Sequence, residues 1–223
     1  MLKLVIGNKN YSSWSLRPWL AMRHLDIPFE EVLIPLDEPE TKTMILTHSP
    51  GGKVPILKDG DVTVWESLAI LEYLAEAFPE KSLWPSRPAA RAVARAISCE
   101  MHAGFTAIRS ACPMNLRKRF AYRDRGADVT RDAVRIQQMW SECLRRSASE
   151  GPFLFGPFSA ADAMFAPIVA RFEGYSIPVD DTVRAYMDTV LSMPAFLEWK
   201  AAGEKETWVL AHDEVDEPAI AAE

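Results

Sequence analysis

Cysteine is scarce in this chain and poorly spaced for the chemistry that cysteine usually supports. Only Cys99, Cys112 and Cys143 occur among 223 residues, and no two of them form a CxxC pair. Three scattered thiols do not build a disulfide framework, a zinc site or a dithiol redox motif. We therefore expect no bound metal, and we expect the chemistry of the protein to come from other side chains.

Long apolar runs and an excess of positive charge are missing as well. The longest apolar runs fall short of the roughly 18 residues that cross a membrane. The first residues, MLKLVIGNKNY, turn polar too early for a secretory signal. A net charge of -6 weighs against nucleic acid or an anionic membrane as the main partner. These features predict a cytoplasmic protein that binds neither.

The first 80 residues alternate between strand-like and helix-like patterns. LKLVIG and PFEEVLI are typical of strands, and SLRPWLAMRHL between them has helical spacing. After an irregular piece, Asp59-Gly60 supplies turn residues between KVPIL and VTVW, which predicts a hairpin. SLAILEYLAEAF then predicts a helix. A strand–helix–strand start followed by an antiparallel pair indicates a mixed sheet with helices packed on it.

The character of the chain changes after residue 80. Residues 81–88 hold prolines and serines and predict a linker. Almost all of residues 89–210 has helical spacing, including AARAVARAISCEMHAGFTAI, a helix capped by Thr130, and AFLEWKAAG. Residues 211–223 are acidic and aperiodic, which predicts a disordered tail. The expected fold is a small α/β domain, residues 1–80, followed by an all-helical domain, residues 89–210.

The stretch KNYSSWSLRPWL places three serines where a strand leads into a helix. Backbone N–H groups at a helix entrance carry partial positive charge. One of Ser12, Ser13 and Ser15 is enough to cap the helix, so another hydroxyl is available to donate to an anion over the helix end. Trp14, between two serines, is a candidate wall of an apolar pocket.

A second candidate region surrounds the hairpin and the helix after it. Pro55 lies inside a predicted strand, which implies an edge, a bulge or a cis peptide bond. A cis bond would leave the backbone of Val54 free to pair with an extended, peptide-like ligand. Ser67 is a natural N-cap, yet a helix N-terminus also suits a carboxylate, and Glu66 suits an ammonium group. A ligand with both groups on one carbon is an α-amino acid.

Together these motifs resemble the cytosolic glutathione transferases over nearly the whole chain. SSWSLRPWLAM is similar to the serine motif of the zeta-class enzymes, where two serines and a cysteine precede a helix that carries an arginine, here Arg17. GKVP resembles the segment whose valine pairs with glutathione ahead of a cis-proline, and ES resembles the pair that grips the γ-glutamyl end. The resemblance implies a thioredoxin-like first domain, glutathione as co-substrate and a homodimer. It assigns glutathione binding to Lys53, Val54, Pro55, Glu66 and Ser67.

Two further features refine the resemblance. FSAAD is similar to the capping box of the family, with Ser159 and Asp162 as a folding signal that has no catalytic role. Trp14 stands where the zeta motif has a cysteine tied to isomerase chemistry, which weighs against a zeta-type isomerase. Ser12 stands where a glutaredoxin-like or omega-like member would carry a cysteine.

The resemblance gives Ser12 the place of the catalytic serine. Lowering the pKa of a thiol by about two units takes roughly 2.7 kcal/mol. A charge-assisted hydrogen bond of roughly 1.5 to 3 kcal/mol nearly supplies this. We expect Ser12 to donate to the thiolate. Tyr11 is the rival donor, because a phenol performs this task in other classes, and Ser13 is either a second donor or the cap.

The second substrate is expected to be a hydrophobic electrophile held between Trp14 and the first helix of the second domain. Candidate pocket residues on that helix and just after it are Met101, His102, Phe105 and Arg109. A histidine on an apolar helix is more often a structural residue than an acid catalyst. An arginine such as Arg109 is more often an ion-pair partner than a ligand contact.

Two other kinds of function remain open on the same residues. One is a glutathione-dependent isomerase, dehalogenase, peroxidase or disulfide reductase that uses the same thiolate. The other is a non-catalytic binding module. The combination of the serine stretch, Val-Pro and Glu-Ser favours a site that binds a ligand over a pure scaffold.

Overall fold

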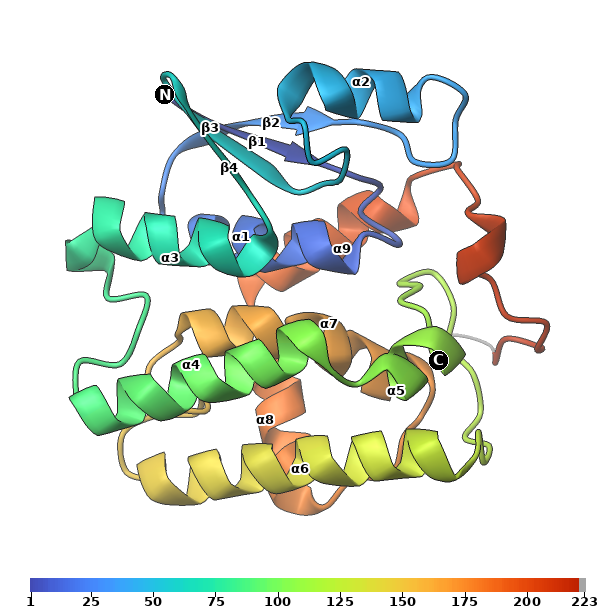
Figure 1. The fold of residues 1–223 in the computed structure, drawn as a ribbon. Helices are drawn as coiled ribbons and strands as arrows, with labels where there is room; N and C mark the ends of the chain where they lie inside the picture. Colours follow the sequence, from blue (N-terminus) through green and yellow to red (C-terminus); the bar gives the residue numbers. More distant parts are fainter. Residues whose placement is uncertain (221–223) are drawn as a thin grey trace.

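The computed structural model describes residues 1–220, and a four-stranded sheet organises its first third (Figure 1). The strands are β1 (Leu2–Ile6), β2 (Phe29–Leu33), β3 (Ile56–Asp59) and β4 (Val62–Trp65), in the order β2-β1-β3-β4. β1 and β2 are parallel, and the other two pairings are antiparallel. The predicted mixed sheet and its hairpin are confirmed.

Helices cover both faces of this sheet because successive residues of a strand point to opposite sides. Leu4 and Ile6 of β1 belong to the core under α1 (Ser13–His24) and α3 (Ser67–Ala77), while Val5 packs on the other side. On that side lies α2 (Thr41–His48), whose Ile45 packs with Val5. The sequence did not predict α2, since Ile45 is its only buried residue and the segment has little apolar periodicity.

The remainder of the fold is helical, as predicted. The helices are α4 (Pro88–Ala103), α5 (Thr106–Ala111), α6 (Ala127–Ser147), α7 (Ala160–Gly174), α8 (Asp181–Leu191) and α9 (Pro194–Glu204), with 3-10 turns η1 (Pro79–Lys81) and η2 (Ala211–Asp213). α7 is buried along almost its whole length and packs against α1 and α4, so it joins the two halves of the molecule (Figure 1). The assignment of residues 81–88 as a linker between domains stays a prediction.

The start of α7 carries the predicted capping box. Asp162 accepts hydrogen bonds from the Ser159 N–H at 2.8 Å and from the Ser159 hydroxyl at 2.9 Å. Both halves of the box are present. Within residues 1–220, no helix is long and apolar enough to cross a membrane.

Two expected helix boundaries are wrong. The single helix predicted from residue 89 to 108 is broken at Gly104 and Phe105, because Gly104 has an extended backbone with φ of -110° and Phe105 is left-handed, with φ of 56°. α6 begins at Ala127 after a Gly126 cap, so Thr130 lies inside the helix and does not cap it.

The structure also contradicts the predicted disordered tail over residues 211–220. Glu214 bonds to the Tyr11 hydroxyl, Glu217 forms an ion pair with Arg125 at 2.6 Å, and the Ile220 N–H donates to a backbone carbonyl at 2.8 Å. This segment therefore packs against both halves of the molecule. Residues 221–223 of the predicted tail lie outside the described residues.

Candidate functional site

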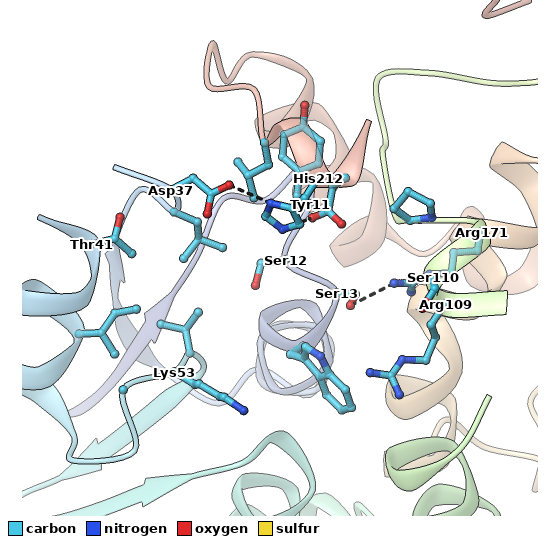
Figure 2. A pocket seen from close by; sticks show the side chains of 18 of the residues that line it. Tyr11, Ser12, Ser13, Asp37, Thr41, Lys53, Arg109, Ser110, Arg171 and His212 are labelled. Carbon is cyan, nitrogen blue, oxygen red and sulfur yellow. Dashed lines mark hydrogen bonds and ion pairs between the residues drawn. The ribbon is translucent and has the colours of Figure 1, made fainter. Parts of the chain in front are cut away.

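Two adjoining cavities lie where the start of α1, the segment that leads into β3 and the helical half of the protein meet. The larger has a volume of about 630 Å³ and the smaller about 340 Å³. Trp14, Lys53, Val54 and Arg109 line both of them. The larger contains the serine stretch and extends to η2 (Figure 2), and the smaller reaches the start of α3.

The serines at the α1 entrance bond to one another and to the helical half, and they do not cap the helix. Ser12 is the N-cap residue of α1, yet its side chain makes no capping hydrogen bond. Its oxygen lies 2.7 Å from that of Ser15, which also accepts from the Gly7 N–H at 3.1 Å. The Ser13 oxygen accepts from Arg171 at 3.3 Å. Ser12 and Ser13 both line the larger cavity.

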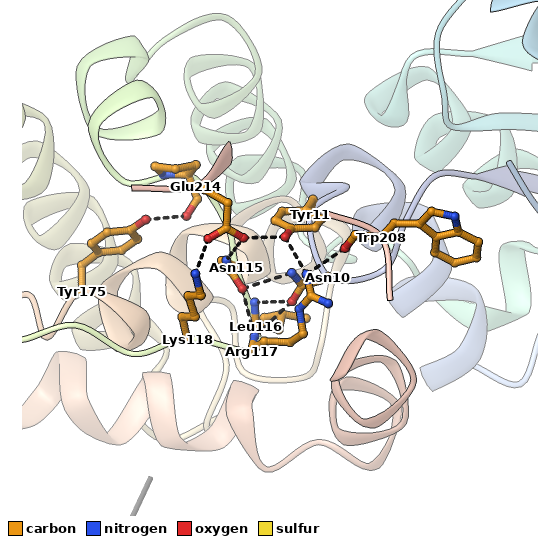
Figure 3. Close-up of polar contacts among 10 residues, drawn as sticks. Asn10, Tyr11, Asn115, Leu116, Arg117, Lys118, Tyr175, Trp208 and Glu214 are labelled. Atoms are coloured by element: carbon orange, nitrogen blue, oxygen red, sulfur yellow. Dashed lines mark hydrogen bonds and ion pairs between the residues drawn. The ribbon is translucent and has the colours of Figure 1, made fainter. Parts of the chain in front are cut away.

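The Tyr11 hydroxyl is engaged on the side facing the C-terminal segment. It donates to Glu214 at 2.5 Å and accepts from Arg117 at 2.6 Å, within a network that includes Asn115 (Figure 3). In Figure 2 this hydroxyl points away from Ser12. Burial raises the pKa of Tyr11, and its bond to Glu214 raises it further. Of the two candidate donors to a thiolate, Ser12 is therefore the better placed.

The residues expected to hold glutathione are brought together in the smaller cavity. Lys53, Val54, Pro55, Glu66 and Ser67 all line it, and the Val54–Pro55 peptide bond is cis. Glu66 has φ of 72°, a conformation that costs a non-glycine residue of order 1 to 3 kcal/mol. The Ser67 hydroxyl is buried at the first position of α3 with no hydrogen-bond partner within residues 1–220. A polar ligand would supply that partner.

The wall formed by Trp14 is more highly charged than expected. The Arg17 guanidinium lies 3.8 Å from the centre of a Trp14 ring, and that of Arg109 lies 4.8 Å away. The His102 ring meets Trp14 edge-on at 5.2 Å. Burial lowers the pKa of His102, whose Nε2 lies 3.5 Å from Glu66. A neutral imidazole is therefore favoured beside the tryptophan.

The structure separates the four expected pocket residues into two pairs. His102 and Arg109 line the cavities. Met101 is fully buried in the core and Phe105 is only 8% exposed, and neither lines either cavity. The expectation that Met101 and Phe105 form the pocket wall is therefore wrong, because both side chains are buried in the hydrophobic core.

Sequence reasoning missed several residues of the larger cavity. Arg171 comes from α7, Asp37 and Thr41 flank the start of α2, and His212 and Asp213 come from η2. The Nδ1 atom of His212 lies 2.9 Å from Oδ2 of Asp37, and both residues line the cavity (Figure 2). A signal for Arg171 was present, since a lone arginine in the apolar run AADAMFAPIVARF is unusual in a buried helix.

The chain is similar to known proteins over its first domain and, more weakly, over most of its length. Residues 11–77 match the family model of the glutathione S-transferase N-terminal domain. The part of the chain that holds the serine stretch and the Val54–Pro55 bond is thus similar to the first domain of the glutathione S-transferases. A Caenorhabditis elegans protein named "probable maleylacetoacetate isomerase" is 29% identical over 83% of this chain and 86% of its own length. The glutathione S-transferase GstB of Escherichia coli is 33% identical over 41% of this chain and 45% of its own.

Solved structures of the family share the fold. A glutathione transferase homologue from Burkholderia, solved with bound glutathione, matches 92% of this chain and 99% of its own with a TM-score of 0.66 and 22% identity. A silkworm glutathione S-transferase matches 92% and 98%, with a TM-score of 0.70 and 18% identity. Within residues 1–220, no cluster of three His, Cys, Asp or Glu side chains could hold a metal ion.

Proposed function

We propose that this protein is a glutathione transferase that activates the thiol of glutathione at the amino end of α1 and transfers it to an electrophile. The observation that carries the proposal is the Ser12 hydroxyl, which lines the cavity at the start of α1 and makes no capping bond. The glutathione S-transferase domain match over residues 11–77 supports the same conclusion.

Glutathione would occupy the smaller cavity and reach into the larger. Its γ-glutamyl ammonium suits Glu66, and its α-carboxylate suits the unpartnered Ser67 hydroxyl at the N-terminus of α3. Its backbone would pair with Val54, and Lys53 would attract its glycyl carboxylate. This orientation directs the cysteinyl sulfur toward α1.

Ser12 would then stabilise the sulfur as an anion. A free thiol has a pKa near 8.5 and is mostly protonated at neutral pH, whereas the thiolate is the nucleophile. A hydroxyl that donates to the thiolate, assisted by the positive end of α1, lowers that pKa by about one to two units. Ser12 acts as a donor in this scheme and takes no proton.

An isomerase is the second candidate. The similarity to a protein named "probable maleylacetoacetate isomerase" extends over 83% of this chain. Trp14 stands where the zeta-class motif has a cysteine that is tied to isomerase chemistry, so we prefer the transferase. An activity panel of aryl halides, organic peroxides, epoxides, a hydroxyethyl disulfide and maleyl ketones would separate the two, together with the peroxidase and reductase alternatives.

We also propose that the protein is a cytoplasmic homodimer, with the first domain of one subunit against the helical domain of the other. On β4, at the edge of the sheet, Val62 and Trp65 are each 46% exposed, and on α4 Val93 is 37% exposed. Burial of these apolar side chains against a second copy would favour association. Sedimentation of the purified protein tests this, and a monomer at all concentrations would exclude it.

The ultraviolet absorbance of the glutathione thiolate tests the catalytic proposal. Wild type, Ser12→Ala and Tyr11→Phe are titrated with saturating glutathione from about pH 5 to 9. Wild type should show a bound thiol with a lowered pKa, Ser12→Ala should raise that pKa by about one to two units, and Tyr11→Phe should leave it unchanged. Binding without a thiolate in wild type would exclude the transferase mechanism.

A further inference from the structure

Three arginines without a carboxylate partner in the described part of the chain lie at the larger cavity: Arg109 and Arg171 line it, and Arg17 stacks on Trp14, which also lines it. Within residues 1–220, no carboxylate oxygen lies within 4.0 Å of Arg17, Arg109 or Arg171. Most other arginines of the protein have such a partner, for example Arg95 with Glu72 and Arg135 with Glu100. The cluster is exceptional in a chain whose net charge is -6.

The buried members of the cluster bond only to neutral acceptors. Arg17 is 1% exposed, donates from Nε to the Met164 carbonyl at 3.0 Å, and keeps Nη1 buried without a partner. Arg171 is 6% exposed and donates to two backbone carbonyls and to the Ser13 hydroxyl. Its guanidinium has N–H groups beyond these three bonds.

An uncompensated charge in such a place is costly. Removing a cation from water without an anion beside it is unfavourable, and neighbouring cations add repulsion. Burial and the nearby Arg109 lower the pKa of Arg171 to about 10. At neutral pH the guanidinium is therefore still charged, and an anion placed beside it would relieve both costs.

The acids of the cavity lie elsewhere or are already engaged. Asp37 is paired with His212, and in Figure 2 Asp37 lies on the opposite side of Ser12 from Arg109 and Arg171. Glu66 lies beside His102 in the smaller cavity, where it suits the ammonium group of glutathione. Asp213 lines the larger cavity and attracts Arg171, but not within ion-pair distance.

We infer that the electrophilic co-substrate carries a carboxylate, and that Arg171 and Arg109 bind this carboxylate beside the Ser13 hydroxyl. The inference rests on the proposed transferase function and narrows its substrate class from the hydrophobic electrophile that the sequence suggested to one that carries a negative charge. Ser12 and Ser13 are adjacent, so the sulfur anion at Ser12 and the carboxylate at Arg171 flank a common space. The reacting carbon of the electrophile would lie there.

A matched pair of electrophiles provides the test: 4-chloro-3-nitrobenzoate and its methyl ester. In both, the sulfur anion forms a carbon–sulfur bond, chloride leaves with the electron pair of the carbon–chlorine bond, and the thiol proton goes to solvent. Each kcat/KM is divided by the uncatalysed rate with glutathione. Wild type should prefer the carboxylate by about tenfold or more, the gain expected from one charge-assisted hydrogen bond.

Substitution of the arginines should abolish that preference. Arg171→Gln and Arg109→Gln should each lower kcat/KM for the carboxylate about tenfold to a hundredfold and leave the ester within about threefold. Within residues 1–220, the Arg109 side chain donates only to the Gly104 carbonyl just before α5, so Arg109→Gln keeps the test usable if Arg171→Gln fails to fold. Arg131→Gln is the matched control, since Arg131 is exposed on α6.

The other outcomes separate this inference from the proposed function. If wild type converts the ester as well as the carboxylate, or the arginine variants slow both equally, the anionic acceptor is excluded and the transferase stands. If the variants raise the KM for glutathione and spare both acceptors, the arginines bind glutathione and the inference is wrong. If neither electrophile reacts and bound glutathione forms no thiolate, the proposed function itself fails.

Discussion

The hydroxyl oxygens of Ser12 and Ser15 lie 2.7 Å apart, one turn of α1 from each other. Ser15 is fully buried and already accepts from the Gly7 N–H. In this arrangement the Ser12 hydroxyl donates to Ser15. Rotation of both hydroxyls would let Ser15 donate to Ser12 and turn the Ser12 hydrogen into the cavity when a sulfur anion binds. This chain of donors would strengthen the bond from Ser12 to a sulfur anion.

Ser15→Ala tests that chain. Loss of the Ser15 donor should raise the pKa of bound glutathione by about half a unit to one unit and lower kcat/KM at about pH 6.5 by three- to tenfold. The thiolate absorbance and the pH profile of kcat/KM measure this. Ser110→Ala, on the same cavity wall, is the control. A Ser15→Ala variant that loses stability but keeps the wild-type pKa would limit Ser15 to a structural role.

Tyr11→Phe should lower the stability of the protein and leave its catalysis nearly unchanged. Removal of the hydroxyl takes one hydrogen-bond partner from Glu214 and one from Arg117, in a region where Tyr11 is 4% exposed. We expect the free energy of unfolding to fall by about 1 to 3 kcal/mol, with kcat within about twofold of wild type. Urea unfolding and steady-state kinetics measure the two effects. A large loss of kcat in a stable variant would make Tyr11 the thiolate donor.

The ordered C-terminal segment predicts an unequal effect of two similar substitutions. Glu217 pairs with Arg125, and the side chains are 12% and 9% exposed. Glu217→Gln should lower the free energy of unfolding by about 1 to 3 kcal/mol, because it leaves a buried guanidinium without its counter-ion. Glu142→Gln removes an exposed acid that also pairs with arginine, and it should cost less than about 1 kcal/mol. Equal losses of unfolding free energy in the two variants would mean that residues 211–220 do not stabilise the buried charge of Arg125.

Much of the fold could be predicted because its signals are local. The Asp59-Gly60 turn, the Val54–Pro55 pair and the box of Ser159 with Asp162 each depend on a few neighbouring residues. The candidate glutathione residues lie on consecutive elements of one small domain, so their spacing along the sequence predicts that they lie close together in the fold.

The remaining features depend on contacts between distant segments. Glu214 bonds to Tyr11 across a separation of 203 residues, which neither composition nor periodicity reveals. Met101 and His102 differ by one position on α4, but one faces the core and the other faces the cavity. Sequence alone does not fix the rotation of a helix against its neighbours. Arg171 lies at the site because α7 packs against α1, a contact between segments far apart in the sequence.

The buried carboxyl of Asp162 predicts a dependence of stability on pH. Burial raises the pKa of Asp162 to about 6, although hydrogen bonds from Ser159 and Leu154 partly offset the shift. In the unfolded chain the pKa is about 3.9. Between about pH 4 and 6 the folded protein therefore binds a proton that the unfolded chain has released. The contribution of Asp162 to stability is full below this window and falls by about 3 kcal/mol as the pH rises through it.

Asp162→Asn isolates this effect from the other titrating groups, because an amide does not ionise. Urea unfolding of both proteins at about pH 4.5 and 7.5 gives the free energy of unfolding at each end of the window. We expect wild type to lose about 1 to 3 kcal/mol relative to Asp162→Asn on raising the pH, since part of the titration is already complete at the lower value. A difference that is constant with pH, or that grows in favour of wild type, would mean that the three donors to Asp162 outweigh burial and hold the carboxylate charged.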